Sequence, residues 1–176
     1  MHLKKLRTMN NENHITMNEL VGRLRQEQSH LMRYACYRLG NADDAKDALQ
    51  DAYLKVWGKL QNGSEVKDWR NYIFRTLANI CTSRLSLSRR LKTIPLDSRV
   101  DLADIPFESN EADYQRIAQL LTEIPEEQAE VIRLRIYGNN SFADVAEILS
   151  LPLPTVKSRF LYGLEKIRKA MKQTSH

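Results

Sequence analysis

The sequence contains few residues that interrupt helices or cross-link the chain, and it lacks long apolar runs. Its 176 residues include only six glycines, five prolines and two cysteines. Cys36 and Cys81 belong to no CxxC pair and no Cys/His cluster, so we expect two reduced thiols and neither a disulfide nor a zinc site. No apolar run approaches the roughly 18 residues of a membrane span. The N-terminus also lacks the apolar core of a secretory signal.

The alternation of apolar and polar residues that marks a half-buried strand is also missing, although short apolar runs such as residues 131–132 are ambiguous alone. Hydrophobic residues make up 42% of the chain, which is enough to bury a core. The scarce glycines and prolines fall between segments of helical spacing, where helices should stop. The ten that we place at such ends are Gly22, Gly40, Gly58, Gly63, Pro95, Pro106, Pro125, Gly138, Pro152 and Pro154. We therefore predict an all-α protein.

The periodicity predicts helices in seven segments. Residues 18–39 form one or two of them, and the others are 43–60, 68 to the mid-eighties, 113–123, 125–138, 142–149 and 155–172. The clearest apolar stripe lies on 43–60 and consists of Ala45, Leu49, Ala52, Tyr53, Val56 and Leu60. Trp69, Ile73, Leu77 and Ile80 form the inward stripe of the next helix. Ser141 and Asp144 fit a capping box that opens helix 142–149.

Charge is distributed unevenly along the chain, and this distribution suggests its organisation. The net charge is +5 overall, but it is +5 over residues 64–92, −7 over 93–127 and +5 over 154–176. Two basic blocks around an acidic one suggest two surfaces that face polyanions. We predict an N-terminal tail (1–16), two small helical domains (17–92 and 113–174) and a flexible acidic linker (93–112).

The last two predicted helices form a helix-turn-helix candidate joined by residues 150–154. Val156, Phe160, Leu164, Ile167 and Met171 form the buried stripe of the second helix. Its other side presents polar and basic side chains at the N-terminal end, the end that a recognition helix inserts into the major groove. These are Thr155, Lys157, Ser158, Arg159 and Tyr162. An ordinary basic surface helix has the same pattern, so the residues alone leave both readings open.

Two further helix faces carry polar side chains away from their apolar stripes. Asp47, Gln50 and Asp51 lie opposite the stripe of helix 43–60 and form either a solvated acidic face or a dock for a basic partner helix. On the following helix, Asn71, Arg75 and Asn79 share the face away from the core. Asparagine is a mediocre helix former, and its amide can pair with base edges, but a polar surface without a function explains the pattern equally well.

Residues 18–172 resemble the extracytoplasmic-function (ECF) group of bacterial sigma factors. Residues 43–57 (DDAKDALQDAYLKVW) look like the region-two helix that this family docks on the RNA polymerase clamp. Residues 68–80 (DWRNYIFRTLANI) resemble its minus-ten reading helix, and residues 124–159 are similar to region four, which reads the minus-thirty-five element. The three motifs occur in the family's order over nearly the whole chain, which makes the resemblance specific.

The resemblance implies a role for each polar face. It assigns polymerase binding, to the β′ clamp and the β subunit, to Asp47, Gln50 and Asp51. It implies that Asn71, Arg75 and Asn79 bind minus-ten DNA. It also implies that the loop residues Asn62, Ser64 and Lys67 hold a base that is flipped out of the opened strand. It implies that the minus-thirty-five element is bound by Thr155, Lys157, Ser158, Arg159 and Tyr162. Tyr162 stands where many relatives carry arginine, so the promoter sequence does not carry over.

The resemblance further implies an alternative sigma factor that binds core RNA polymerase and promoter DNA. We expect no enzyme, cofactor, metal or small-molecule substrate, because none of the four histidines joins a catalytic cluster. We expect a monomer in the bacterial cytoplasm, held by an anti-sigma factor that can tether it to the inner membrane. One alternative is a sigma mimic that binds only an anti-sigma factor, and another is a helix-turn-helix repressor, which predicts dimers and palindromic half-sites.

Overall fold

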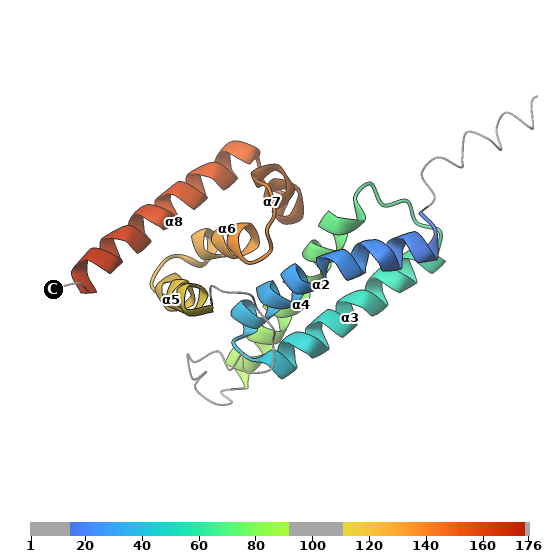
Figure 1. The fold of residues 1–176 in the computed structure, drawn as a ribbon, viewed down its shortest axis with the longest axis horizontal. Helices are drawn as coiled ribbons and strands as arrows, with labels where there is room; N and C mark the ends of the chain where they lie inside the picture. The colour runs from blue at the N-terminus through green and yellow to red at the C-terminus, as the bar shows by residue number, and fades with distance from the viewer. Residues whose placement is uncertain (1–14, 92–110, 175–176) are drawn as a thin grey trace, which may run out of the picture.

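The computed structural model describes residues 15–91 and 111–174, and within these ranges the chain forms helices and no strand (Figure 1). The helices in chain order are α2 (Met17–Leu39), α3 (Ala42–Gln61), α4 (Trp69–Arg90), α5 (Glu111–Leu121), α6 (Glu126–Ile136), α7 (Phe142–Leu149) and α8 (Leu153–Thr174). They confirm the seven predicted helical segments. The predicted tail and linker lie almost entirely outside the described residues. None of the described helices combines the length and the apolar character that a membrane span requires.

Polar side chains cap the start of most of these helices. Thr16 accepts a hydrogen bond from the backbone N–H of Glu19 in a capping box, and Asn41 and Asp68 cap α3 and α4. Ser141 forms the predicted capping box with Asp144 at the start of α7. Such caps satisfy N–H groups that have no partner inside the helix, and each contributes about 1 kcal/mol. The helix boundaries are therefore encoded locally.

Four predicted boundary positions are wrong. Gly22 and Gly58 lie inside α2 and α3, because the glycines face open space and the apolar stripes on the other sides of the helices continue past them. Helix α8 begins at Leu153 rather than at residue 155, since Pro154 fits a first turn, where its missing N–H has no acceptor. Pro125 occupies the N-cap position of α6 rather than its first turn.

Helices α2, α3 and α4 pack together as a three-helix group. The predicted stripe of α3 faces inward, with its alanines, Leu49 and Val56 buried and with Tyr53 and Leu60 half-buried. The predicted inward residues of α4 are also buried. They pack against the side of α2 that carries Leu31, Ala35 and Cys36.

Helices α5 to α8 form a second group, in which α7 and α8 are the predicted helix-turn-helix. Val156 and Ile167 are buried, and the other three residues of the predicted α8 stripe are half-buried against the core, as expected. Gly163 lets α8 approach α6 closely, because a Cβ there would lie 2.6 Å from Cδ1 of Ile132. Ser150, which ends α7, adopts a left-handed conformation with φ of 54°.

The two groups are packed against each other, with α2 beside α6 and α4 beside α7. An aromatic cluster lies between them. The ring of Tyr37 on α2 stacks on Tyr137 at a centroid distance of 4.2 Å, and both rings contact the edge of Tyr114 on α5. Tyr37 and Tyr137 are buried, so the contact excludes water. The sequence predicted the two groups but not this arrangement.

Candidate nucleic-acid interface

The N-terminal half of α8 presents its polar side chains to solvent. Val156 faces the core, whereas Lys157 and Ser158 are exposed, and Tyr162 is 60% exposed. Thr155 and Arg159 are half-buried on the flanks of this face. Helix α8 lies on the outside of the second group (Figure 1). The structure therefore brings the five predicted minus-thirty-five residues onto one accessible helix end.

The face predicted to read minus-ten DNA on α4 is covered by α7. Asn71 is only 3% exposed, and its amide donates to the carboxylates of Asp144, at 3.2 Å, and Glu147, at 2.9 Å. The guanidinium of Arg75 donates to the backbone carbonyls of Glu147 and of Ile148, the latter at 3.2 Å. Asn71 and Arg75 do face away from the core of their own helical group, as predicted. They face the other group instead of solvent.

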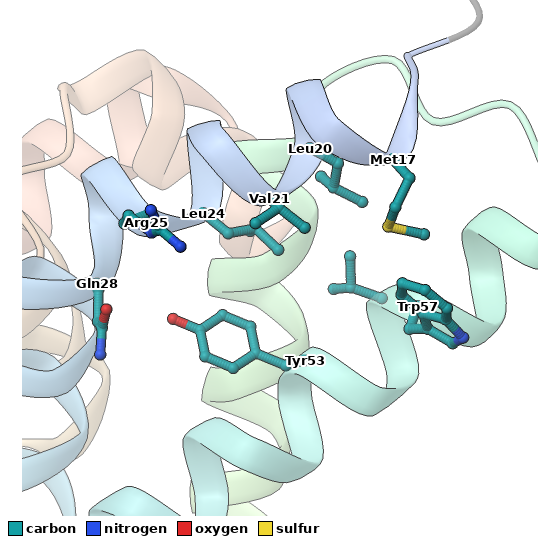
Figure 2. Close-up of a pocket in the computed structure, with 9 residues that line it drawn as sticks. Met17, Leu20, Val21, Leu24, Arg25, Gln28, Tyr53 and Trp57 are labelled. Carbon is teal, nitrogen blue, oxygen red and sulfur yellow. The ribbon is translucent and has the colours of Figure 1, made fainter.

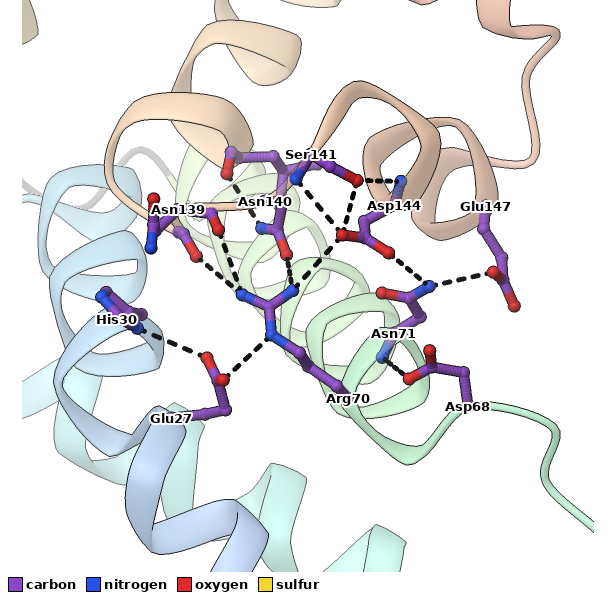
Figure 3. Close-up of polar contacts among 12 residues, drawn as sticks. Glu27, His30, Asp68, Arg70, Asn71, Asn139, Asn140, Ser141, Asp144 and Glu147 are labelled. Carbon is purple, nitrogen blue, oxygen red and sulfur yellow. Dashed lines mark hydrogen bonds and ion pairs between the residues drawn. The ribbon is translucent and has the colours of Figure 1, made fainter.

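Arg70 lies at the centre of this contact, and sequence reasoning missed it (Figure 3). Its Nε pairs with Glu27 on α2 at 3.0 Å, and its Nη atoms reach the side chain of Asn140 and the carbonyls of Gly138 and Asn139. One of its partners, Asn140, is 70 positions away in the chain. No local pattern signals such a contact, because arginine at an exposed helix position is unremarkable in a sequence.

Asn79 is separated from Asn71 and Arg75. It is exposed and lines a surface hollow of about 460 Å³ between α3 and α4, together with Asp51 and Leu54. The loop residues are separated as well. Lys67 lines a cavity of about 300 Å³ between α2 and the start of α4, whereas Asn62 and Ser64 do not line it. The predicted minus-ten residues therefore do not form one continuous site in this arrangement.

The predicted polymerase-binding residues of α3 form an exposed face. Asp47, Gln50 and Asp51 are all accessible, and Leu54 beside them is 65% exposed. Asp51 makes an ion pair of 2.7 Å with Arg84 of α4. Exposed leucine within a charged surface is typical of a protein-binding face, because the apolar contact supplies binding energy and the charges fix orientation.

A second apolar feature lies on the other side of α3, where an unfilled groove of about 260 Å³ runs between α2 and α3 (Figure 2). Figure 2 shows Met17 and Trp57 at one end of the groove and the Tyr53 hydroxyl directed towards the side of Arg25 and Gln28. Trp57 is 44% exposed.

The cysteines are buried and unpaired as thiols. Burial raises the pKa of Cys36 and of Cys81 to about 12, so both thiols are protonated at neutral pH and are poor nucleophiles. The described residues hold no group of three or more His, Cys, Asp or Glu side chains that is arranged to bind a metal ion.

Family models match both helical groups. The model for Sigma-70 region 2 matches residues 24–91, and the model for Sigma-70 region 4 matches residues 120–169. The first contains α3 and α4, and the second contains the α7–α8 helix-turn-helix. The order and placement agree with the resemblance of the three sequence motifs.

Curated relatives and solved structures agree with the family models. The ECF RNA polymerase sigma factor SigM of Mycobacterium tuberculosis is 32% identical over 139 residues, which cover 77% of this chain and 68% of the relative. SigW of Bacillus subtilis is 24% identical over 157 residues, covering 78% and 81%.

The fold matches the sigma factor RpoE in its complex with the anti-sigma factor NepR from Bartonella quintana, with a TM-score of 0.70, 23% identity and coverage of 89% of this chain and 98% of that one. It also matches CnrH in complex with the cytosolic domain of CnrY, with a TM-score of 0.66, 18% identity and 90% coverage of each chain. Together with the relatives and the two region models, these matches show that the chain belongs to the ECF family of RNA polymerase sigma factors, the alternative sigma factors that direct transcription initiation.

Proposed function

We propose that three helix faces have separate binding roles in transcription initiation. The face of α3 around Asp47, Gln50 and Asp51 holds core RNA polymerase. The polar face of α4, with the loop before it, holds the opened minus-ten segment, and the N-terminal half of α8 reads duplex DNA at the minus-thirty-five element. Under this proposal the protein works by binding alone, as a monomer in the bacterial cytoplasm, and catalysis remains with the polymerase.

The accessible end of α8 is the observation that carries this proposal. A recognition helix needs one face anchored in a core and the other face free to enter the major groove. Val156 anchors α8, while Lys157 and Ser158 point outward at the N-terminal end. Lysine and arginine hold phosphate or read guanine, and serine and threonine can do either. Further along α8, Lys166 and Arg168 are exposed and suit phosphate contacts.

The charge on α3 supports polymerase docking by this helix. Its exposed carboxylates suit a basic partner helix, and Leu54 adds an apolar contact at the centre. The ion pair between Asp51 and Arg84 joins α3 to α4, so a partner that binds Asp51 also meets the start of the hollow that contains Asn79. We place polymerase contact at this edge of the molecule.

An anti-sigma factor is the second partner that we propose. One solved structure of similar fold is the sigma factor RpoE in complex with the anti-sigma factor NepR, and another is CnrH in complex with the cytosolic domain of CnrY. Such a partner, when membrane-bound, would hold the chain at the inner membrane until release. The rival hypothesis of a sigma mimic predicts the loss of basic residues from the DNA faces, and here both basic blocks keep a net charge of +5.

A reconstitution with core polymerase tests the proposal. We expect the chain to bind core and to start transcripts in vitro from promoters of its host. The Asp51→Ala variant should weaken core binding roughly tenfold, as expected for a residue near the centre of an interface, and should keep the helical circular dichroism spectrum. The matched control is Glu127→Ala, which removes an exposed carboxylate from α6.

Three results would contradict the assignment. A chain that does not bind core polymerase is not acting as proposed. A chain that binds an anti-sigma factor but no core polymerase supports the sigma mimic, and a holoenzyme that starts no transcript contradicts a role in promoter recognition. Stable dimers that protect palindromic half-sites without polymerase support the repressor.

A further inference from the structure

The two proposed DNA-reading faces differ in accessibility. The α8 face is open to solvent, whereas Asn71 and Arg75 on α4 are occupied by groups from α7. Arg70, the residue before Asn71, is occupied by groups from the segment that leads into α7. Arg70, Asn71 and Arg75 all donate hydrogen bonds across this contact, and the groups that accept them are carboxylate and carbonyl oxygens.

The groups on the α7 side have the chemistry of a nucleic acid. They are the carboxylates of Asp144 and Glu147 and the last carbonyls of α7, at the end of the helix where its dipole is negative. Phosphate oxygens and base carbonyls are the corresponding acceptors in DNA. The same donors of α4 cannot satisfy both sets of acceptors at once. Helix α7 therefore occupies the positions that a DNA strand would need.

A second cluster, between α2 and α6, holds this contact in place. Arg38 of α2 pairs with Glu126 at 2.9 Å and with Glu130 at 3.1 Å, and the hydroxyl of Tyr34 donates to Glu130. Arg133 on α6 pairs with the same two carboxylates. The side chains of Arg38 and Glu130 are only 8% and 13% exposed. Buried, hydrogen-bonded charges of this kind hold a defined geometry, because separating the partners while they stay buried is costly.

We infer that α7 is an internal ligand of the minus-ten face of α4, so that binding of α7 and binding of the opened promoter strand to α4 exclude each other. This inference rests on the proposed function of α4. The faces of α3 and of the N-terminal half of α8 are not covered by the contact. Core polymerase and duplex DNA therefore have access to the closed chain, and the minus-ten face becomes available only when the two helical groups separate.

The consequence for affinity follows from mass action. If only a fraction of free chains is open, the apparent dissociation constant for a ligand of the α4 face rises by the inverse of that fraction. Loosening the contact should then strengthen binding of single-stranded DNA. When about two-thirds of the wild-type chains are closed, complete opening gives a gain of roughly threefold, and a more closed chain gives a larger one.

The test uses two variants of the full chain that loosen the contact from the side opposite α4. Glu130→Ala removes the acceptor shared by Tyr34 and Arg38, and Glu147→Ala removes an acceptor of Asn71. Neither residue belongs to a proposed DNA-binding or polymerase-binding face. Glu127→Ala is the control, because it makes the same charge change at an exposed position of α6. Circular dichroism checks folding, and Glu147→Ala serves alone if Glu130→Ala does not fold.

Each variant is then characterised by two measurements. Small-angle X-ray scattering reports the radius of gyration, and fluorescence anisotropy at fixed salt reports affinity for a mixed-sequence single-stranded DNA of 20 nucleotides. We expect both contact variants to expand and to bind this DNA roughly threefold more tightly than Glu127→Ala, in line with the population argument. Adding Arg75→Ala should abolish the gain, since the gain arises at the α4 face.

The outcomes that would contradict the inference can be told apart from those that would contradict the proposed function. The inference is wrong if the variants stay as compact as the control, if they expand without a gain in affinity, or if the gain survives Arg75→Ala. Transcription by the wild-type holoenzyme separates this inference from the proposed function. Normal transcripts together with any of these three results overturn the inference alone. A gain that depends on Arg75, in a chain that starts no transcript, overturns the proposed function and leaves the internal contact established.

Discussion

Helices α4 and α8 are alike in sequence character and different in accessibility. Each is 22 residues long, each buries an apolar stripe, and each directs polar and basic side chains away from its own core. Yet Lys157 on α8 is exposed, whereas Asn71 on α4 is covered by the other helical group. The comparison teaches that a helix pattern predicts which side chains face outward from their own core. Whether those side chains reach solvent depends on long-range packing.

The largest expected effect is on the open helix. Lys157→Ala should weaken binding of the free chain to duplex promoter DNA about tenfold and lower the dependence of log K on log salt concentration by about one unit, because one phosphate or base contact is lost. Fluorescence anisotropy over a salt series measures both. Lys172→Ala, in the last turn of the same helix, is the control and should have a smaller effect. Equal losses for both variants would mean that α8 attracts DNA only by its total charge.

The next effect concerns how α8 is held. Gly163→Ala places a methyl group against Ile132, and such overpacking costs about 1–3 kcal/mol. The better helix propensity of alanine returns up to about 1 kcal/mol, so the free energy of unfolding should fall by about 1 kcal/mol. Gly22→Ala is the matched control, since it has nothing within 4 Å and should stabilise α2. Denaturant unfolding measures both, and a stabilised Gly163→Ala would show that α6 and α8 are less closely packed than described.

A smaller effect is expected at the joint between α7 and α8. Ser150 has a φ of 54°, a conformation that glycine adopts without strain. Ser150→Gly should therefore raise the melting temperature, with a gain of about 0.5–1 kcal/mol in the free energy of unfolding. Duplex DNA binding through α8 should stay unchanged. A loss of stability would indicate that the serine side chain contributes more than its backbone strain costs.

The smallest effect is a pH dependence of the covered helix. Burial acts to raise the pKa of Asp144, but hydrogen bonds from Ser141 and Asn71, with Arg70 nearby, outweigh it and hold the pKa below its ordinary value. A carboxyl with a depressed pKa stabilises the folded state fully above its unfolded pKa of about 3.9, and it loses that stabilisation as the pH falls through its folded pKa. The difference in unfolding free energy between wild type and Asp144→Asn should therefore shrink below about pH 4. A constant difference between pH 3 and pH 6 would contradict this.

Local patterns were sufficient to predict the helices and the cap of α7. The Ser141–Asp144 box and the α3 stripe depend on residues three or four positions apart, so the sequence displays them directly. The start of α8 was misplaced because proline was read as a joint, although it also suits a first turn. Gly163 was missed because its role depends on Ile132, thirty-one positions earlier in the chain.

The candidate site was predictable only in part. The exposure of Asp47, Asp51 and Lys157 followed from their positions opposite an apolar stripe. The burial of Asn71 did not, because its partners lie on a helix more than seventy positions away. The stacking of Tyr37 on Tyr137 has the same origin. Periodicity within one helix carries no information about which other helix will cover it.

Asp144 links two properties that selection would otherwise adjust independently. Its carboxylate caps α7 through Ser141 and also accepts the amide hydrogen bond of Asn71. Glutamate is the commoner residue at this position of a capping box, but its extra methylene group would move the acceptor relative to α4. A single inherited substitution there would change the local fold of region four and the threshold for opening together. Descendants of this chain can therefore tune that threshold with fewer side effects through Glu147, which also accepts from Asn71 but lies outside the cap.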